Sequence, residues 1–161
     1  MSSLRKRLVI IHRRTELNEL LDRHVTRGQV EFFLKSRGRS LDLVQYFHDL
    51  DEELRHRLKS SLPPEWVIAE VERNDLSRFL FADDDAIAVV GQDGLVANVA
   101  KYLNGQLVVG IDPVPRRHLG VLVRHGLRTG LNLILDPSQA TVAELTTVVA
   151  QADTGPLGPV N

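Results

Sequence analysis

The amino-acid sequence predicts an α/β domain with a largely parallel sheet flanked by helices. Short apolar runs of strand length alternate along the chain with segments whose apolar residues recur at helical spacing. The clearest of these runs, Ala86 to Val90, ends in the turn Gly91-Gln92-Asp93-Gly94, and a helical pattern follows at once. A buried strand, a tight turn and a helix in this order are typical of parallel sheets.

The first half of the chain favours two strands and three helices. Residues 8–11 and 66–71 are the expected strands, and the double proline at 63–64 ends the helix between them. Thr15 and Ser40 are suitable N-caps, and residues 26–37 favour a short helix, although 30–34 could also form a strand. The expected apolar stripes are Leu17, Leu20, Leu21, His24 and Val25, then Val30, Phe33 and Leu34, then Leu43, Phe47, Leu50, Leu54 and Leu58.

The second half continues the alternation. After the strand at 86–90 we expect a helix over 95–103, stopped by Asn104-Gly105, and a strand over 107–111, closed by Pro113. Residues 121–123 and 131–135 are strand-like. Pro137-Ser138 opens a helical pattern with Val142, Leu145, Val148 and Val149 on one face. We expect a single domain over 1–153 and a disordered tail over 154–161.

Composition favours a globular protein. Of the 161 residues, 43% are hydrophobic and 25% are charged, and the net charge of −1 does not suggest a nucleic-acid partner. The chain has no Cys, so a disulfide framework, a thiolate metal site and a Cys nucleophile are excluded. No apolar run has the length of a signal-peptide core or of a membrane span. We expect a soluble cytoplasmic protein with no membrane partner.

The turn at 91–94 is the candidate functional site. Ligands of open α/β sheets bind at the carboxyl ends of strands, and the free N–H groups of a helix N-terminus attract anions. Asp93, placed between two glycines, would face such a ligand. It could polarise or deprotonate a hydroxyl, or hold a magnesium ion against phosphates. The alternative is an ordinary Asp-Gly turn that binds nothing.

This turn and its flanks resemble the Gly-Gly-Asp-Gly-Thr motif of the NAD kinase family, which shares its phosphate-binding core with diacylglycerol kinases and phosphofructokinases. The resemblance covers about residues 6–122 and is specific over 76–122. It implies a Rossmann-like amino-terminal domain of the NAD kinase and diacylglycerol kinase type. It also implies that ATP and magnesium serve to phosphorylate the ribose 2′-hydroxyl of NAD, giving NADP. In that reaction Asp93 would be the catalytic residue that acts on the hydroxyl.

The chain departs from the family pattern at three positions. Gln92 stands for a glycine, and its side chain could bond a ligand or crowd it. Leu95 stands for a threonine, and it also fits a core stripe with Val99. Asp112 stands for an asparagine at the end of a strand, and a carboxylate there would repel phosphate unless magnesium or an arginine lies between them. The expected ligand-binding residues of this region are Gly91, Gln92, Gly94, Leu95 and Asp112.

Cations elsewhere could add to the site. Arg13 and Arg14 follow the first strand, so they belong at the same sheet edge as Asp93 and are candidates for phosphate contact. The acidic run 83–85 belongs at the opposite end and is expected to be a solvated turn. No histidine pair has zinc-ligand spacing. The densest cationic stretch, which could clamp phosphates or simply be solvated, consists of Arg116, Arg117, His118, Arg124, His125 and Arg128.

The family resemblance leaves a second hypothesis open. NAD kinases have a further, mostly β domain that holds part of NAD, and nothing after Gly120 resembles it. The alternative function is therefore a catalytically inactive nucleotide-binding module, or a degenerate relative that needs a partner domain. A receiver-like domain is a weaker third hypothesis, because such domains carry an acidic pair where this chain has His12-Arg13-Arg14. In each of the first two hypotheses the partner is a nucleotide or dinucleotide, and we expect a homo-oligomer.

Overall fold

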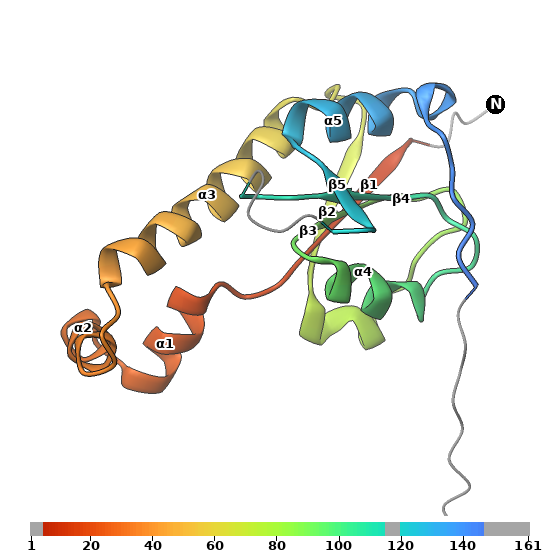
Figure 1. Cartoon of the computed structure of the whole chain (residues 1–161). Coiled ribbons are helices and arrows are strands. Elements are labelled where there is room, and N and C mark those ends of the chain that lie inside the picture. Colours follow the sequence, from red (N-terminus) through yellow and green to blue (C-terminus); the bar gives the residue numbers. More distant parts are fainter. Residues whose placement is uncertain (1–4, 115–119, 147–161) are drawn as a thin grey trace, which may run out of the picture.

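A parallel sheet in the order β2-β1-β3-β4-β5 runs through the centre of the computed structural model (Figure 1). The structure describes residues 5–114 and 120–146, and all five strands of this part of the chain belong to the sheet. The α/β class and the parallel sheet are confirmed. The strands are β1 (Arg7–His12), β2 (Val67–Glu72), β3 (Ala86–Val90), β4 (Val108–Ile111) and β5 (Val123–His125).

The central strands are apolar because the sheet is covered on both faces. Leu8 to Ile11 of β1 are fully buried, and so, within about 1% exposure, are Ile87 to Val90 of β3. Successive side chains point to opposite faces, so each strand supplies two separate cores. The expected strand at 86–90 has the observed bounds of β3, and 8–11 lies within β1.

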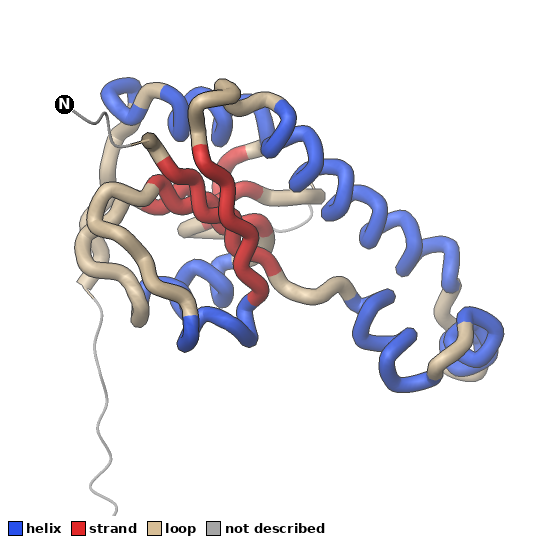
Figure 2. The backbone as a smooth tube through the Cα atoms, turned by 180° about the vertical axis from the view of Figure 1, so that it is seen from behind, coloured by secondary structure: helices blue, strands red, loops and turns tan. Residues whose placement is uncertain are grey.

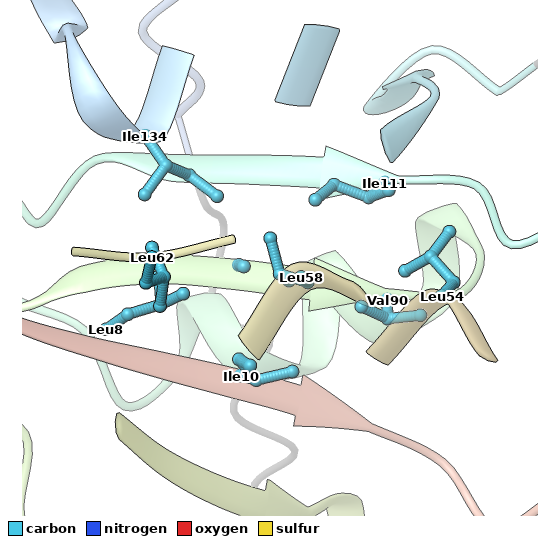
Figure 3. Packing of buried hydrophobic residues seen from close by; sticks show 9 residues of the cluster. Leu8, Ile10, Leu54, Leu58, Leu62, Val90, Ile111 and Ile134 are labelled. Carbon is cyan, nitrogen blue, oxygen red and sulfur yellow. The ribbon is translucent and has the colours of Figure 1, made fainter. Parts of the chain in front are cut away.

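Helices α3 (Leu41–Ser60) and α5 (Leu127–Leu135) cover one face of the sheet, while α4 (Asp93–Ala100) and the 3-10 helix η1 (Arg73–Arg78) cover the other. Figure 3 shows the first core, in which Leu54 and Leu58 of α3 lie over the central strands. The first core contains Leu8, Ile10, Leu54, Leu58, Leu62, Ala88, Val90, Ile111 and Ile134. The second contains Val9, Ile11, Val71, Leu76, Ile87, Val89, Leu95 and Val99.

A helical arm extends from the carboxyl edge of the sheet and has a small core of its own (Figure 2). We use this name for α1 (Glu16–His24), α2 (Arg27–Lys35) and the first half of α3. The hydroxyls of Thr15, Thr26 and Ser40 accept backbone N–H bonds at the starts of these helices, as Thr15 and Ser40 were expected to do. Residues 30–34 are therefore helical. The arm core contains Leu17, Leu20, Val30, Leu34, Leu41 and Val44.

A polar network attaches α3 to the edge strand β2. Arg55 is buried and donates to Asp51 over 2.9 Å and to Glu70 of β2 over 3.0 Å. Lys59, one turn further on, donates to the other oxygen of Glu70. These charges make even α3, the longest helix, strongly polar. Among the described residues, no helix combines the length and the apolar character that crossing a membrane would require.

Four expectations are wrong. Val25 does not belong to the buried stripe of α1, because it follows the helix as its C-cap residue and is exposed. Residues 131–135 belong to α5, because Leu127, Leu131, Ile134 and Leu135 pack on the first core at helical spacing. Leu43 is 54% exposed, since α3 turns its neighbour Val44 towards α1 and α2 instead. From Pro137 only the 3-10 helix η2 (Pro137–Gln139) forms, and 140–146 has no regular structure. Val148 and Val149 of the expected helix, and the expected disordered tail over 154–161, lie outside the described residues.

A buried ion pair ties the amino end of β1 to the loop before β3. Arg7 holds Asp85 through two bonds of 2.7 Å and donates to the carbonyl of Leu80 over 3.1 Å. Burial acts to raise the pKa of Asp85, but the bonds from Arg7 and from the Ala82 N–H outweigh it and lower that pKa below its ordinary value. The run at 83–85 thus lies at the expected end of the sheet, but its last residue is not solvated.

We expect Asp85→Asn to lower the free energy of unfolding at pH 7 by about 2 kcal/mol. Removing one partner of a fully buried ion pair costs about 3–5 kcal/mol. The loss is smaller here because the Arg7 side chain is 30% exposed. The folded-state pKa is depressed, so the stabilisation is present at neutral pH and is lost as the pH falls below about 4. Urea denaturation of both proteins between pH 7 and pH 3 should show the deficit of the variant shrinking. A deficit that stays constant would contradict an ionised partner for Arg7.

Candidate functional site

A cleft of about 440 Å³ opens at the carboxyl edge of the sheet. Its walls come from residues that follow β1, β3 and β4 and from one face of α3. The strand order reverses between β1 and β3, which is where open α/β sheets bind ligands, and the volume is that of a small-molecule site. The cleft brings together every predicted site residue except Asp93: Arg13, Arg14, Gly91, Gln92, Gly94, Leu95 and Asp112.

The turn after β3 brings backbone N–H groups to this cleft. Gly91 has a φ of +152°, which other residues rarely adopt, and its N–H donates to the carbonyl of Ile111 over 3.1 Å. Gln92 is the N-cap residue of α4, but its side chain does not bond the helix end. The first turn of α4 therefore has no side-chain cap, and the helix presents its positive end at the cleft.

Asp93 has a structural role in the observed arrangement. Its carboxylate accepts the backbone N–H groups of Val121, Leu122 and Val123 over 2.7, 3.2 and 2.9 Å. These bonds, that of Val123 foremost, hold the pKa of Asp93 below its ordinary value. The residue lines an adjoining hollow of about 240 Å³ rather than the larger cleft. A carboxylate bonded in this way is a weak base, and its catalytic and magnesium-binding roles stay predictions.

The backbone at Gly120 lies directly against this carboxylate. A Cβ atom at Gly120 would collide with the carboxylate of Asp93, so any other residue there would have to displace that carboxylate. The three N–H groups that follow then point at a single anion. Asp93 thereby fastens the segment that leads into β5 to the first residue of α4.

Three arginines line the cleft. Arg13 and Arg14 were predicted, and Arg73, which follows β2 at the same edge, was not. Arg14 pairs with Asp22 over 2.5 Å, while its buried Nε has no partner among the residues described. Arg13 lies a loose 4.0 Å from Glu19. Among the residues that the structure describes, Arg73 forms no ion pair.

The rest of the cationic stretch contributes less. Arg116, Arg117 and His118 lie outside the described residues. Arg124 and Arg128 are exposed and line neither hollow, and Arg124 donates to the carbonyl of Val121 over 2.7 Å. His125 contributes its backbone carbonyl, which accepts the N–H of Asp112. Among the described cations, the arginines of the cleft are therefore the best placed to contact a phosphate.

One face of α3 forms the wall opposite the turn. Val44, Phe47, His48 and Asp51 all line the cleft, at the spacing of one helix face. Only Phe47 belonged to the expected stripe, although this spacing was visible in the sequence. Burial raises the pKa of Asp51, even though bonds from Arg55 act in the other direction. The wall is thus apolar at one end and carries titratable groups at the other.

The two remaining departures from the family motif behave differently. Leu95 is 5% exposed and packs in the second core, as its alternative interpretation predicted. Asp112 is half-buried, lines both hollows, and accepts the N–H of Val114 over 2.8 Å. Within the described residues no three His, Cys, Asp or Glu side chains are grouped to hold a metal ion. A magnesium ion at this edge would therefore take its remaining ligands from water or from a bound phosphate.

The chain matches no protein-family profile and shows no significant sequence match to a curated protein. The resemblance to NAD kinases therefore depends on the turn at 91–94 and its flanks. What the structure adds is the cleft beside that turn.

We expect Asp93→Ala and Gly120→Ala to act through one interaction. Each should lower the free energy of unfolding by about 1–3 kcal/mol, because each leaves the N–H groups of 121–123 without their acceptor. The double variant should cost no more than either single variant. Urea denaturation measures all three free energies.

Gly94→Ala is the matched control, because a Cβ at Gly94 meets nothing within 4 Å. It should be neutral or slightly stabilising, since alanine favours a helix over glycine. Additive losses for Asp93→Ala and Gly120→Ala would show that the two residues do not act together.

Proposed function

We propose that this domain binds a phosphate-bearing nucleotide in the cleft at the carboxyl edge of the sheet. The observation that carries the proposal is the meeting of Arg13, Arg14 and Arg73 with the uncapped start of α4 around one cleft. Guanidinium groups bind phosphate through paired, charge-assisted bonds, and helix N-termini bind it through N–H groups. The position between β1 and β3 is the usual nucleotide position in doubly wound sheets.

The cleft also has an apolar wall that suits the base of a nucleotide. Val44 is buried and Phe47 is half-buried in the α3 wall, opposite the turn at 91–94. An apolar wall that includes an aromatic ring is suited to a planar base, while the arginines suit the phosphates. A ligand with one apolar end and one anionic end therefore matches the two walls.

ATP-dependent phosphorylation of NAD is our second proposal. It is supported by the resemblance of the turn and its flanks to the NAD kinase motif and by the cleft next to that turn. It requires Asp93 to exchange its bonds with Val121, Leu122 and Val123 for a bond to the acceptor hydroxyl. Binding without turnover needs no such exchange, which is why we place nucleotide binding first.

Isothermal titration with ATP, ADP and NAD, with and without magnesium, tests the first proposal. We expect binding in the micromolar to millimolar range, and Arg13→Gln and Arg73→Gln should each weaken it about tenfold by removing a charged bond to phosphate. Arg128→Gln is the control, because Arg128 is exposed and lies outside the cleft. No binding of any of the three nucleotides, or equal losses in all three variants, would overturn the proposal.

An assay of NADP formation from ATP and NAD tests the second proposal. Turnover should disappear in Asp93→Asn while the protein stays folded by circular dichroism. Binding of ATP without any NADP formation by the wild type would reject the kinase proposal and leave the binding module. Trp66 precedes β2, at the amino edge of the sheet, so its fluorescence is not expected to report on the cleft.

A further inference from the structure

His48 lies in the α3 wall of the cleft and is bonded to Thr15, the N-cap residue of α1. Its Nδ1 atom lies 2.6 Å from the hydroxyl oxygen of Thr15. The same oxygen accepts the backbone N–H of Asn18 over 3.3 Å, which is the N-cap bond of α1. A single hydroxyl thus joins the start of α1 to an imidazole in the cleft.

The bond to Thr15 engages Nδ1 of His48 and leaves Nε2 as the ring nitrogen that faces no partner among the described residues. A hydroxyl has one hydrogen, and the oxygen of Thr15 already accepts from Asn18. When the hydroxyl hydrogen is donated to Nδ1, the imidazole carries its own proton on Nε2. No residue of the described ranges accepts a bond from Nε2. His48 lines the cleft, so Nε2 is the ring atom left to a ligand there.

We propose that His48 is a ligand-binding residue, which donates its Nε2–H to a phosphate oxygen in the cleft, and that Thr15 is its positioning residue. The inference rests on the proposed nucleotide binding and adds to it a donor from α3. Three of the four described carboxylates that line the cleft have cations nearby, while Asp112 accepts the N–H of Val114. Glu16 is bonded to Arg39, Glu19 lies near Arg13, and Asp51 is bonded to Arg55.

His48 approaches the cleft from a different side than the arginines do. Arg13 and Arg14 follow β1, and Arg73 follows β2, so these cations all approach from the sheet edge. His48 approaches from α3, opposite the turn at 91–94. A phosphate between these walls would be bonded from both sides, and the arm would be attached to the sheet through the ligand.

The test is isothermal titration of ADP, and of pyrophosphate as the smallest probe, into the full chain and its variants. His48→Ala should weaken ADP binding about tenfold, and His48→Gln, which keeps a donor, should recover part of the loss. Thr15→Val should weaken binding less, Thr15→Ser should be close to wild type, and Thr15→Val should add nothing in the His48→Ala background. His56→Ala is the matched control, because His56 is an exposed histidine of the same helix outside the cleft.

Nitrogen-15 NMR of the wild-type imidazoles gives a readout that a structural role alone would not produce. It should show a protonated Nε2 and an unprotonated Nδ1 for His48, and Nε2 should shift when ADP is added. Wild-type binding of ADP with equal effects of His48→Ala and His56→Ala would overturn the inference and leave the proposed function intact. A proton found on Nδ1 would also overturn it. Absence of ADP and pyrophosphate binding by the wild type would overturn both.

Discussion

The constraint on which this structure depends is the burial of β1 and β3 on both faces. Strands without a polar face need a helical layer above and below, and the connections between parallel strands supply both layers. Because those connections cover the faces, the sheet is open at its ends. The carboxyl edge then collects strand ends, the start of α4 and the side chains that follow β1 and β2. The cleft is thus a product of the same burial that stabilises the fold.

At this edge the chain uses one of its own anions. The carboxylate of Asp93 takes up three successive N–H groups of the segment before β5, an arrangement that could equally receive a phosphate oxygen. Asp93 thus holds β5, a strand of three residues, in place. The NAD kinase motif would instead assign this residue to catalysis. The start of α4 and the arginines keep their exposure to the larger cleft. The proposed binding and the observed anchoring are therefore divided between two sides of one turn.

Local patterns predicted much of this molecule, and long-range contacts account for what they missed. The strand at 86–90 and the caps Thr15 and Ser40 depend on neighbouring residues, and parallel strand ends brought Arg13, Arg14 and the turn together on one edge. The partners of Asp93 lie some thirty residues away, so no spacing could show them. The rotation of α3 that selects Val44 over Leu43 depends on α1 and α2. Arg73 reaches the cleft only because β2 lies beside β1.

The separate core of the helical arm has a dynamic consequence. Its six buried residues are all aliphatic and make a smaller cluster than either core of the sheet, so the arm is a natural unit of sub-global opening. Amide hydrogens of α1 and α2 would then exchange with solvent sooner than those of β1. Since the arm supplies one wall of the cleft, an occupant touching both walls would slow that exchange. Affinity would in turn respond to aliphatic substitutions in the arm that never meet the occupant.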